Sequence, residues 1–414
     1  MAKLQPVRGT HDLLSEDAAR HRHVTEAFRA IAMRFGFGEI ATPIFEFSEV
    51  FKRTLGETSD VVTKEMYSFT DRGGEEITLR PEYTAGIARA FISGGLSQNL
   101  PLKFFASGPM FRYERPQKGR QRQFHQLDAE ILGVAEPLAD IEVIALGDQL
   151  LAELGIAHQT TLELNSLGDR ESRAAYREAL VAYFGGHRGA LSEDSLLRLE
   201  RNPLRILDSK DEGDRRVITG APEMGDYLNP ESADFFAAVR DGLDQLGIAY
   251  EVKPRLVRGL DYYTHTAFEF TTTALGSQGA VIAGGRYDGL IEAMGGPPTP
   301  GIGWASGIER LAMLIDAPPD MRRLIAVIPI DAEAERDALV LTHRLRQAGF
   351  TVDLGYRGNV GKRMKRANRL GARAAVLLGE DERAAGVVTL RDLDTGEQES
   401  VPLLELNDRL AAHR

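Results

Sequence analysis

The chain has 414 residues, and its 61 acidic and 50 basic side chains give a formal net charge of −11. This charge argues against a protein that binds nucleic acid over its whole surface, because such proteins are usually basic, but it allows a local basic surface. Its 43% of apolar and 27% of charged residues are typical of a globular protein of two or three domains and exclude disordered and fibrous classes. Because the sequence contains no cysteine, disulfides, thiolate nucleophiles and zinc or iron–sulfur sites with cysteine ligands are excluded.

The N-terminal segment MAKLQPVRGTHDLL turns polar at once and lacks the apolar stretch of an export signal. No window of the chain approaches about 18 uninterrupted apolar residues, so we expect no membrane span and a cytoplasmic protein. Apolar side chains at near-helical spacing predict a first helix over residues 16–37. A short strand is predicted over residues 39–45, interrupted by Pro43, which is tolerated at a sheet edge or an interface.

Residues 102–133 predict two strands joined by a charged loop. Side chains alternate between the two faces of a strand, so the first strand directs Arg112 and Glu114 to one face. The second strand carries polar side chains on one face and mostly apolar ones, expected to pack inward, on the other. The polar face holds Gln126, Asp128 and Glu130, and the apolar face holds His125, Leu127, Ala129 and Ile131. Such a polar face is covered either by solvent or by a bound ligand.

The loop between these strands is strongly basic. It holds Glu114 as its single acid against five cations, Arg112, Arg115, Lys118, Arg120 and Arg122. Cations at this density favour an anion, such as the phosphates of ATP or a nucleic-acid end. The alternative is a charged turn that only keeps the surface hydrated.

Long charged helical patterns replace the strand patterns from about residue 166 to residue 250 and predict a helical insertion in a β-rich domain. Strand patterns return at residues 256–274 and continue to residue 290. The glycine-rich segment GIGWASGIER then predicts a strand that runs into a helix, with Arg310 in the first helical turn. An arginine there joins the helix N-terminal amides in attracting phosphate, although close packing alone also explains such glycines.

Pro318 and Pro319 mark a predicted linker. The residues after it show strand and helix patterns in the order βαβαβ, which predicts an α/β domain with a largely parallel sheet. We therefore divide the chain into a domain of residues 1–320, interrupted by the insertion at about 166–250, and a C-terminal domain of residues 321–414.

Seven cations and no acid lie between residues 357 and 373. On a helix, four of them share one face: Lys362, Lys365, Arg366 and Arg369. In a chain of net charge −11, such a one-sided basic stripe favours contact with a phosphate backbone. A hydrated helix face, which usually mixes both signs of charge, is the alternative.

The motifs of several other site classes are missing from the sequence. It has no P-loop, no Rossmann glycine pattern, no HExxH pair and no GxSxG elbow, and its nine histidines are scattered. We therefore expect no metal held by protein ligands alone, although carboxylates such as Glu114 could hold Mg²⁺ together with ATP phosphates.

Three separated segments correspond to motifs 1, 2 and 3 of class II aminoacyl-tRNA synthetases. They are GEIATPIFE at 38–46, FRYERPQKGR at 111–120 and GIER at 307–310. Within this class the chain resembles the histidyl-tRNA synthetase family from one end to the other. The matching segments are LRPEYTAG (79–86), FRYERPQKGRQRQFHQ (111–126), LVRGLDYYTHTAFEF (256–270), GGRYDGL (284–290) and GIGWASGIERL (301–311).

This resemblance implies a fold and an activity. The implied fold is an α+β catalytic domain, an antiparallel sheet flanked by helices and broken by a helical insertion, followed by a C-terminal α/β anticodon-binding-like domain. The implied activity is histidine–tRNA ligation: ATP, with Mg²⁺, activates histidine to histidyl-adenylate plus pyrophosphate, and the histidine passes to the 3′-terminal ribose of tRNA-His. Motif 1 implies a homodimer.

The resemblance also implies roles for individual residues. Arg112 is expected at the ATP α-phosphate and the amino-acid carboxylate, Arg310 at the γ-phosphate, and Arg258 beside the scissile α-phosphate. Glu114 is expected to position ATP or its Mg²⁺. The expected histidine pocket consists of Glu82, Thr84, Gln126, Glu130, Tyr263, Arg286 and Tyr287. The expected tRNA contacts are Arg115 and Gln117 at the acceptor end and, from the basic stripe, Lys362, Lys365 and Arg366.

Several positions depart from the family pattern, among them those near Ala129 and Asp169, where relatives often have cysteine. Gln121 stands where the family commonly has tyrosine, and Tyr83 where it commonly has glycine or methionine.

Two other functions are alternatives. The first alternative is a catalytically silent paralogue that regulates ATP phosphoribosyltransferase. Such paralogues usually lack the terminal domain and have lost the pattern around LVRGLDYY. This chain has both the domain and the pattern. The second alternative is another class II synthetase, such as a prolyl or threonyl enzyme. The segments LVRGLDYYTHT and GGRYDGL, which match the histidine-specific motifs, argue against it.

Overall fold

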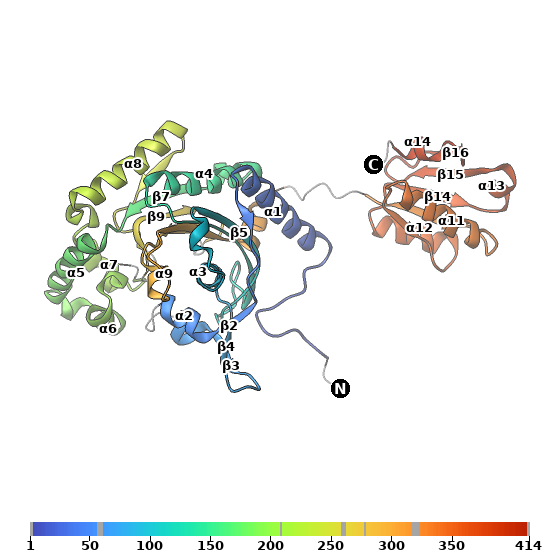
Figure 1. Ribbon diagram of the computed structural model, residues 1–414. Coiled ribbons are helices and arrows are strands. Elements are labelled where there is room, and N and C mark those ends of the chain that lie inside the picture. Colours follow the sequence, from blue (N-terminus) through green and yellow to red (C-terminus); the bar gives the residue numbers. More distant parts are fainter. Residues whose placement is uncertain are drawn as a thin grey trace. The chain divides into compact units, whose positions relative to one another are not determined.

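The computed structural model describes residues 3–55, 61–207, 209–257, 262–276, 279–316 and 323–411. The chain divides into two compact units, Met1–Pro318 and Pro319–Arg414, each described here by itself (Figure 1). Within the described ranges, no helix has both the length and the apolar character that crossing a membrane requires.

The first unit is built on a sheet of eight strands, most of them antiparallel. In spatial order the strands are β1 (Gly38–Glu39), β5 (Leu102–Phe111), β6 (Gln123–Leu132), β11 (Gly301–Gly307), β10 (Ala280–Arg286), β9 (Thr264–Thr271), β7 (Thr161–Ser166) and β8 (Tyr250–Val252). Only the outermost pairs, β1 with β5 and β7 with β8, run parallel. The expected antiparallel sheet flanked by helices is thus confirmed.

The predicted hairpin is formed by β5 and β6, which pair along their whole length. On its other side β6 pairs with β11, so that Glu130 lies opposite Gly303. Leu127, Ala129 and Ile131 belong to the main hydrophobic core, as the strand alternation predicts. The polar face of β6 is buried as well, because Gln126, Asp128 and Glu130 have almost no exposure to solvent. The alternative of a solvent-covered sheet face is therefore wrong.

Helices cover both faces of this sheet. Helices α1 (Ser15–Arg34), α4 (Pro137–Glu153) and α8 (Pro230–Leu246) pack with the sheet around one core, and α10 (Ile308–Leu314) joins them. Figure 1 shows α1 and α4 lying along the same side of the sheet. On the opposite face, α3 (Thr84–Ser93) and α9 (Leu290–Ala293) pack around a second core. The first predicted helix is confirmed, and it ends close to Gly36, whose φ of 78° favours glycine.

The strand predicted over residues 39–45 is divided in the structure. Its start forms β1 in the large sheet, whereas Phe45 opens β2 (Phe45–Phe47) in a separate three-stranded sheet with β4 (Glu76–Leu79) and β3 (Tyr67–Thr70). Pro43 lies between the two strands, because a residue without a backbone N–H is not suited to the interior of a ladder. Helix α2 (Ser48–Leu55) follows β2 directly.

Between β7 and β8 the chain is helical. Helices α5 (Arg170–Gly185), α6 (Glu193–Arg201) and α7 (Glu212–Ile218) enclose a small core of their own around Tyr176 and Phe184. The last helix of this segment, α8, instead packs its Val239 and Leu243 into the main core. Single helical turns of the first unit lie at Val61–Glu65, Leu96–Asn99, Ala157–Gln159, Arg188–Ala190, Pro203–Ile206 and Met224–Tyr227.

The second unit has a five-stranded sheet with helices on both sides. Its strands, in spatial order, are β13 (Val352–Leu354), β12 (Ile325–Pro329), β14 (Ala374–Leu378), β15 (Val387–Asp392) and β16 (Gln398–Pro402). Its helices are α11 (Ala334–Gln347), α12 (Val360–Arg369), α13 (Glu380–Ala385) and α14 (Leu406–Ala411). The pairings of β13, β12 and β14 are parallel, as the βαβαβ pattern predicts. The pairings of β14 with β15 and of β15 with β16 are antiparallel, so the sheet is half parallel rather than largely parallel.

A buried ion pair joins α4 to the end of β10. The side chains of Asp140 and Arg286 are both fully buried, and Arg286 Nε lies 3.1 Å from Asp140 Oδ2. The guanidinium also donates to the carbonyl oxygen of Val134 at 2.9 Å and to Asp288 Oδ1 at 3.0 Å. Removing one partner of such a pair leaves an uncompensated charge away from water, which is strongly destabilising.

We therefore predict that Asp140→Ala lowers the free energy of unfolding by about 3–5 kcal/mol, as is typical when one partner of a buried pair is lost. Gln149→Ala, at an exposed position of the same helix, controls for helix propensity and is expected to change it by less than about 0.5 kcal/mol. Denaturant unfolding followed by circular dichroism measures both variants. Equal stability of the two would contradict the assigned importance of the pair.

Candidate active site

A cavity of about 320 Å³ lies over the face of the sheet formed by β6, β10 and β11. Most of the residues predicted for the site line this cavity: Glu82, Thr84, Arg112, Glu114, Gln126, Tyr263, Tyr287 and Arg310. Arg258, also predicted, lies outside the described residues. The cavity thus has carboxyl and hydroxyl groups at Glu82 and Thr84, and guanidinium groups at Arg112 and Arg310 with the carboxyl groups of Glu114 and Glu309 beside them.

Glu130 lies beneath the lining of the cavity, with 1% of its surface exposed. Its Oε1 accepts a hydrogen bond of 2.6 Å from the Thr84 hydroxyl, and its Oε2 accepts one from the Tyr287 hydroxyl. Gly303 leaves the space for this carboxyl, since a Cβ at that position would lie 1.6 Å from Glu130 Oε2. The glycine in the middle of β11 is therefore required by the close approach of an acidic side chain.

Burial raises the pKa of Glu130 to about 8, although the hydrogen bonds from Thr84 and Tyr287 act in the opposite direction. Burial also raises the pKa of Glu82, against the lowering effect of the Ala85 amide and the Arg112 charge. Carboxyl groups with raised pKa values gather where a protein is built to bind or react. This part of the cavity therefore favours a ligand that brings hydrogen-bond donors or positive charge.

Asp128 was placed on the polar face by strand alternation but given no role. It has no exposure, and its carboxyl group lies beside that of Glu130. Burial and the nearby charges of Glu130 and Glu82 raise its pKa well above the ordinary value. Three buried acidic side chains thus share one region, and only the three-dimensional packing of α3 against β6 brings Glu82 to the other two.

The beginning of α3 places the residues that reach Glu130. Glu82 Oε1 accepts the amide hydrogen of Ala85 at 2.8 Å, so this carboxyl group also satisfies a free N–H of the first helical turn. Arg80 fixes the preceding segment, because it donates to the carbonyl oxygens of Thr42 at 2.8 Å and Pro109 at 2.9 Å. The side chain of Thr84 is thereby held at the cavity.

Two arginines also line the cavity. Arg112 donates to the carbonyl oxygen of Pro81 at 2.9 Å and lies over the ring of Phe124 at 5.4 Å. Arg310 donates to the carbonyl oxygens of Gly119 at 3.1 Å and Ala280 at 2.8 Å. Burial, followed by the positive charges of Arg120 and Arg112, lowers the pKa of Arg310. Such mutual repulsion between guanidinium groups is relieved by a bound anion.

The basic loop between β5 and β6 is more ordered in its contacts than its composition suggests. Arg120 lies 3.0 Å from Glu114, and Arg122 stacks on Tyr113 at 3.8 Å. The backbones of Gln117 and Arg120 exchange two hydrogen bonds across a tight turn. At the tip of the loop the exposed side chains are Arg115, Gln117 and Lys118. These remain for contact with another molecule.

Arg286 does not line the cavity, so its expected place in the histidine pocket wall needs correction. Its guanidinium points instead to Asp140 and Asp288 and is fully buried. Strand alternation accounts for this, because Tyr287 and Arg286 are neighbours and their side chains leave the backbone on opposite sides. Tyr287 reaches Glu130, while Arg286 holds the strand end to α4.

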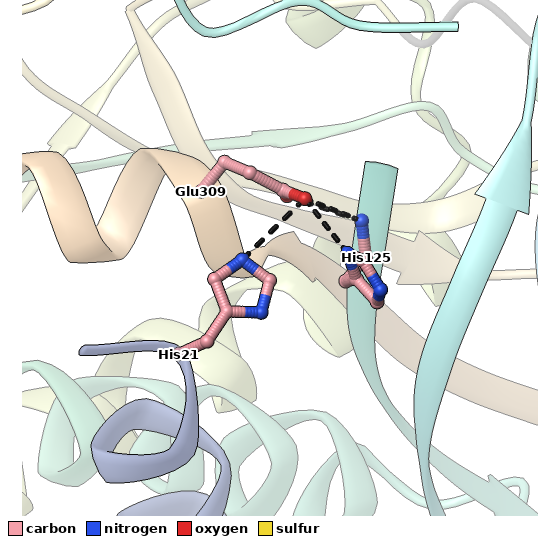
Figure 2. A group of neighbouring side chains, drawn as sticks. All are labelled: His21, His125 and Glu309. Atoms are coloured by element: carbon pink, nitrogen blue, oxygen red, sulfur yellow. Dashed lines mark hydrogen bonds and ion pairs between the residues drawn. The ribbon is translucent and has the colours of Figure 1, made fainter. Parts of the chain in front are cut away.

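Glu309 and two histidines form a group that the sequence motifs did not indicate (Figure 2). Glu309 lines the cavity and accepts hydrogen bonds from the backbone N–H of His125 at 3.0 and 3.1 Å. His125 Nδ1 lies 2.9 Å from Glu309 Oε1, and His21 Nε2 lies 3.5 Å from the same oxygen. Burial by itself would raise the pKa of Glu309, but the hydrogen bonds from His125 and His21 outweigh burial and lower this pKa to about 2.

The basic stripe of the second unit lies on α12. The side chain of Asn359 caps the helix by accepting the Lys362 amide hydrogen at 3.0 Å. Lys362 and Lys365 are exposed, whereas Arg366 pairs with Asp353 at 3.0 Å. Arg363, one of the seven cations, is buried and lies 2.7 Å from Glu335. The stripe is therefore less strongly basic than its sequence implies.

Comparisons with known proteins agree with this arrangement. The sequence model of histidyl-tRNA synthetases matches residues 9–170 and 196–311, and that of anticodon binding domains matches residues 324–413. The histidine–tRNA ligase of Rhodospirillum rubrum is 65% identical over 412 residues, which are 99% of each chain. That of Gluconacetobacter diazotrophicus is 58% identical over 411 residues, again 99% of each chain.

Solved structures show the same likeness. The histidyl-tRNA synthetase of S. aureus is 34% identical, with a TM-score of 0.82 over 98% of this chain and 99% of that chain. An ATP phosphoribosyltransferase regulatory subunit/histidyl-tRNA synthetase from Bacillus halodurans has a TM-score of 0.66 over 92% of this chain and 99% of that chain. At 21% identity, the second likeness concerns the fold alone.

The close approach of Gly303 and Glu130 gives a test of the cavity floor. We predict that Gly303→Ala lowers the free energy of unfolding by about 1–3 kcal/mol, because the added Cβ overpacks the buried carboxyl group. Gly307→Ala on the same strand is the control, since its Cβ would meet no atom nearer than 3.7 Å, and thermal unfolding compares the two. A Gly303→Ala protein as stable as the control would show that the space is not occupied as described.

Proposed function

The chain belongs to the histidyl-tRNA synthetase family, and we propose that it activates histidine with ATP and then joins the histidine to the 3′-terminal ribose of tRNA-His. The observation that carries this function is the cavity lined by Glu82 and Thr84 over the buried Glu130, and by the guanidinium groups of Arg112 and Arg310. A cationic or donor-rich side chain and a polyphosphate suit these two sets of groups. The regulatory alternative is not favoured, because the relatives at 65% and 58% identity over the full length are histidine–tRNA ligases.

The carboxyl and hydroxyl groups of the cavity suit the imidazole of histidine. Imidazole carries one ring N–H when neutral and two when protonated, and a buried carboxyl group accepts such hydrogen bonds strongly. In our proposal Glu130 faces the ring, with Thr84 and Tyr287 holding its carboxyl group in place. Glu130 lies just below the lining of the cavity, and the rest of the proposed pocket consists of Glu82, Gln126 and Tyr263, which line it. An apolar amino acid would leave these buried polar groups unpaired and is therefore rejected.

The guanidinium groups of the cavity suit the phosphates of ATP. In the first step a carboxylate oxygen of histidine forms a bond to the α-phosphorus, and the bond from that phosphorus to pyrophosphate breaks. Fixed positive charge stabilises this transfer without a covalent nucleophile on the protein. We assign Arg112 to the α-phosphate and the histidine carboxylate, and Arg310 to the γ-phosphate. Arg258 is proposed to act beside the α-phosphate on the resemblance of its segment.

The carboxylate of Glu114 fits a role in holding Mg²⁺, because it lines the cavity and offers the hard oxygen atoms that this ion prefers. When bound with ATP, Mg²⁺ neutralises part of the phosphate charge. In the described structure Glu114 lies 3.0 Å from Arg120. This pair keeps both side chains at the edge of the cavity, where the nucleotide phosphates are proposed to bind.

We propose that tRNA-His contacts the chain at two places. The exposed loop tip with Arg115 and Gln117 lies next to the cavity and is suited to the acceptor end. The exposed Lys362 and Lys365, with Arg366 beside them, suit a phosphate backbone. Because Arg366 already pairs with Asp353, the two lysines are expected to contribute most of the attraction.

We also propose that the chain acts as a homodimer in the cytoplasm, where ATP and tRNA are found. Support for the dimer comes from the segment that resembles motif 1. Its strand β2, and β3 on the far side of β4 in the same sheet, expose large aromatic side chains, with Phe45 56%, Phe47 57% and Phe69 49% exposed. Clustered exposed aromatic groups of this kind mark protein contacts.

Pyrophosphate exchange with each of the twenty amino acids tests the function. We expect exchange with histidine alone, and a fall of at least about 100-fold in kcat/KM for histidine in Glu130→Ala, since the ring loses its buried partner. Thr84→Ser is the matched control, because it keeps the hydroxyl that bonds to Glu130. A wild-type chain that ignores histidine refutes the function, whereas full activity of Glu130→Ala refutes only the assigned pocket.

Binding of tRNA-His at roughly physiological salt tests the second contact. The double charge reversal Lys362→Glu and Lys365→Glu is expected to weaken binding about tenfold or more while leaving pyrophosphate exchange unchanged. Arg336→Glu together with Arg344→Glu, at exposed positions of α11, changes the net charge by the same amount and is the control. Equal affinities of this control and the lysine variant would mean that the stripe is a hydrated helix face.

A further inference from the structure

Three side chains that are far apart in the sequence converge beside the cavity. Figure 2 shows His21 on α1, His125 on β6 and Glu309 on α10 pointing toward one another. One possible ligand atom from each residue lies within 4.8 Å of the other two. Among the residues that the structure describes, this is the one group of three histidine, aspartate or glutamate side chains that meets this condition.

We propose that His21, His125 and Glu309 bind one transition-metal ion of the Zn²⁺ type. Two imidazole nitrogens and one carboxylate oxygen are ligands that Zn²⁺ prefers, and three protein ligands leave one position of a tetrahedron open. Nitrogen donors disfavour Mg²⁺ and Ca²⁺, which take oxygen ligands. The site is therefore distinct in its chemistry from any Mg²⁺ that accompanies ATP, and it revises the expectation that no metal is held by protein ligands alone.

Two of the three distances between the ligand atoms are already close to those that such an ion requires. Metal bonds of about 2.0–2.2 Å place tetrahedral ligand atoms about 3.3 Å apart. In the structure His125 Nδ1 and His21 Nε2 lie 2.9 and 3.5 Å from Glu309 Oε1. Each of these distances differs from the tetrahedral value by less than half an ångström. The two imidazole rings meet edge to face, with their centroids 4.8 Å apart, so both can turn a nitrogen toward the same point.

The group also has a weakly satisfied polar atom that a metal would satisfy. His21 Nε2 is buried, and its contact with Glu309 Oε1 is long for a hydrogen bond, at 3.5 Å. A buried polar nitrogen with so weak a partner is uncommon in native proteins. The carboxylate of Glu309, by contrast, is held in place by the backbone N–H of His125. A bonded support behind a ligand is the usual design of a metal site.

Access to the group is open from one side. His21 and Glu309 both line a second pocket, of about 600 Å³, on the side of α10 where α1 packs. The exposed His11 and the acidic Asp17 and Asp316 line the same pocket. An ion can enter through this pocket, and a water molecule or a side chain within it can occupy the open ligand position.

The proposal is tested with Co²⁺, which takes the place of Zn²⁺ and whose visible absorption spectrum depends on the number of its ligands. The full chain, without a tag, is first treated with a chelator and then titrated with Co²⁺. The lack of cysteine means that no thiolate can contribute to the spectrum. We expect one Co²⁺ per chain with the intense bands of four-coordination, displaced by one equivalent of Zn²⁺. We expect His21→Ala to weaken binding at least about 100-fold, beyond what loss of an outer contact costs.

His23→Ala is the matched control, since it removes a histidine two positions along the same helix, about 200° around its axis. It should bind Co²⁺ as the wild type does. His21→Gln replaces His21→Ala if that variant does not fold by circular dichroism. The proposal is overturned if the wild type gives no four-coordinate spectrum, or if loss of His21 and loss of His23 change the affinity equally.

Discussion

A carboxyl group placed away from water at the floor of a cavity constrains the rest of the first unit. Glu130 can be kept there only because hydroxyl groups of Thr84 and Tyr287 satisfy its oxygens and Gly303 leaves room for it. Each of these three residues comes from a different segment, namely the start of α3, the end of β10 and the middle of β11. The sheet order, the helix that covers the sheet and the glycine on the strand are thus all conditions for one buried acid.

The same strand, β6, serves two purposes because side chains alternate across it. Its apolar side chains stabilise the main core together with α1 and α4, while its acidic side chains form the floor of the cavity. Any shift of register by one residue would exchange the two faces. Pairing on both sides, with β5 and β11, prevents this shift, so the stability of the core and the geometry of the site are fixed together.

Local sequence patterns predicted the helices and strands well. They could not show which residues far apart in the sequence contact one another. The hairpin, the alternation along β6 and the resemblance of five segments identify the cavity residues. The sequence does not show that Arg286 meets Asp140, 146 residues away, or that Arg366 meets Asp353 across to β13. Nor does it bring His21 to Glu309, because such contacts depend on how helices pack on a sheet. Periodicity gives the face of an element but not the residue that faces it.

The division of the helical segment between β7 and β8 bears on how such a chain can change over evolution. Helices α5 to α7 bury their apolar side chains against one another, whereas α8 contributes to the main core. Substitutions inside the small core therefore leave the main core intact, and they reach the cavity through the start of α5, where Arg173 donates a hydrogen bond to the backbone oxygen of Tyr263. The match to the family model pauses between residues 170 and 196, which hold α5 and the start of α6, and resumes through the rest of α6 and α7. Helix α8 lacks that freedom, because a change of Val239 or Leu243 would disturb the main core directly.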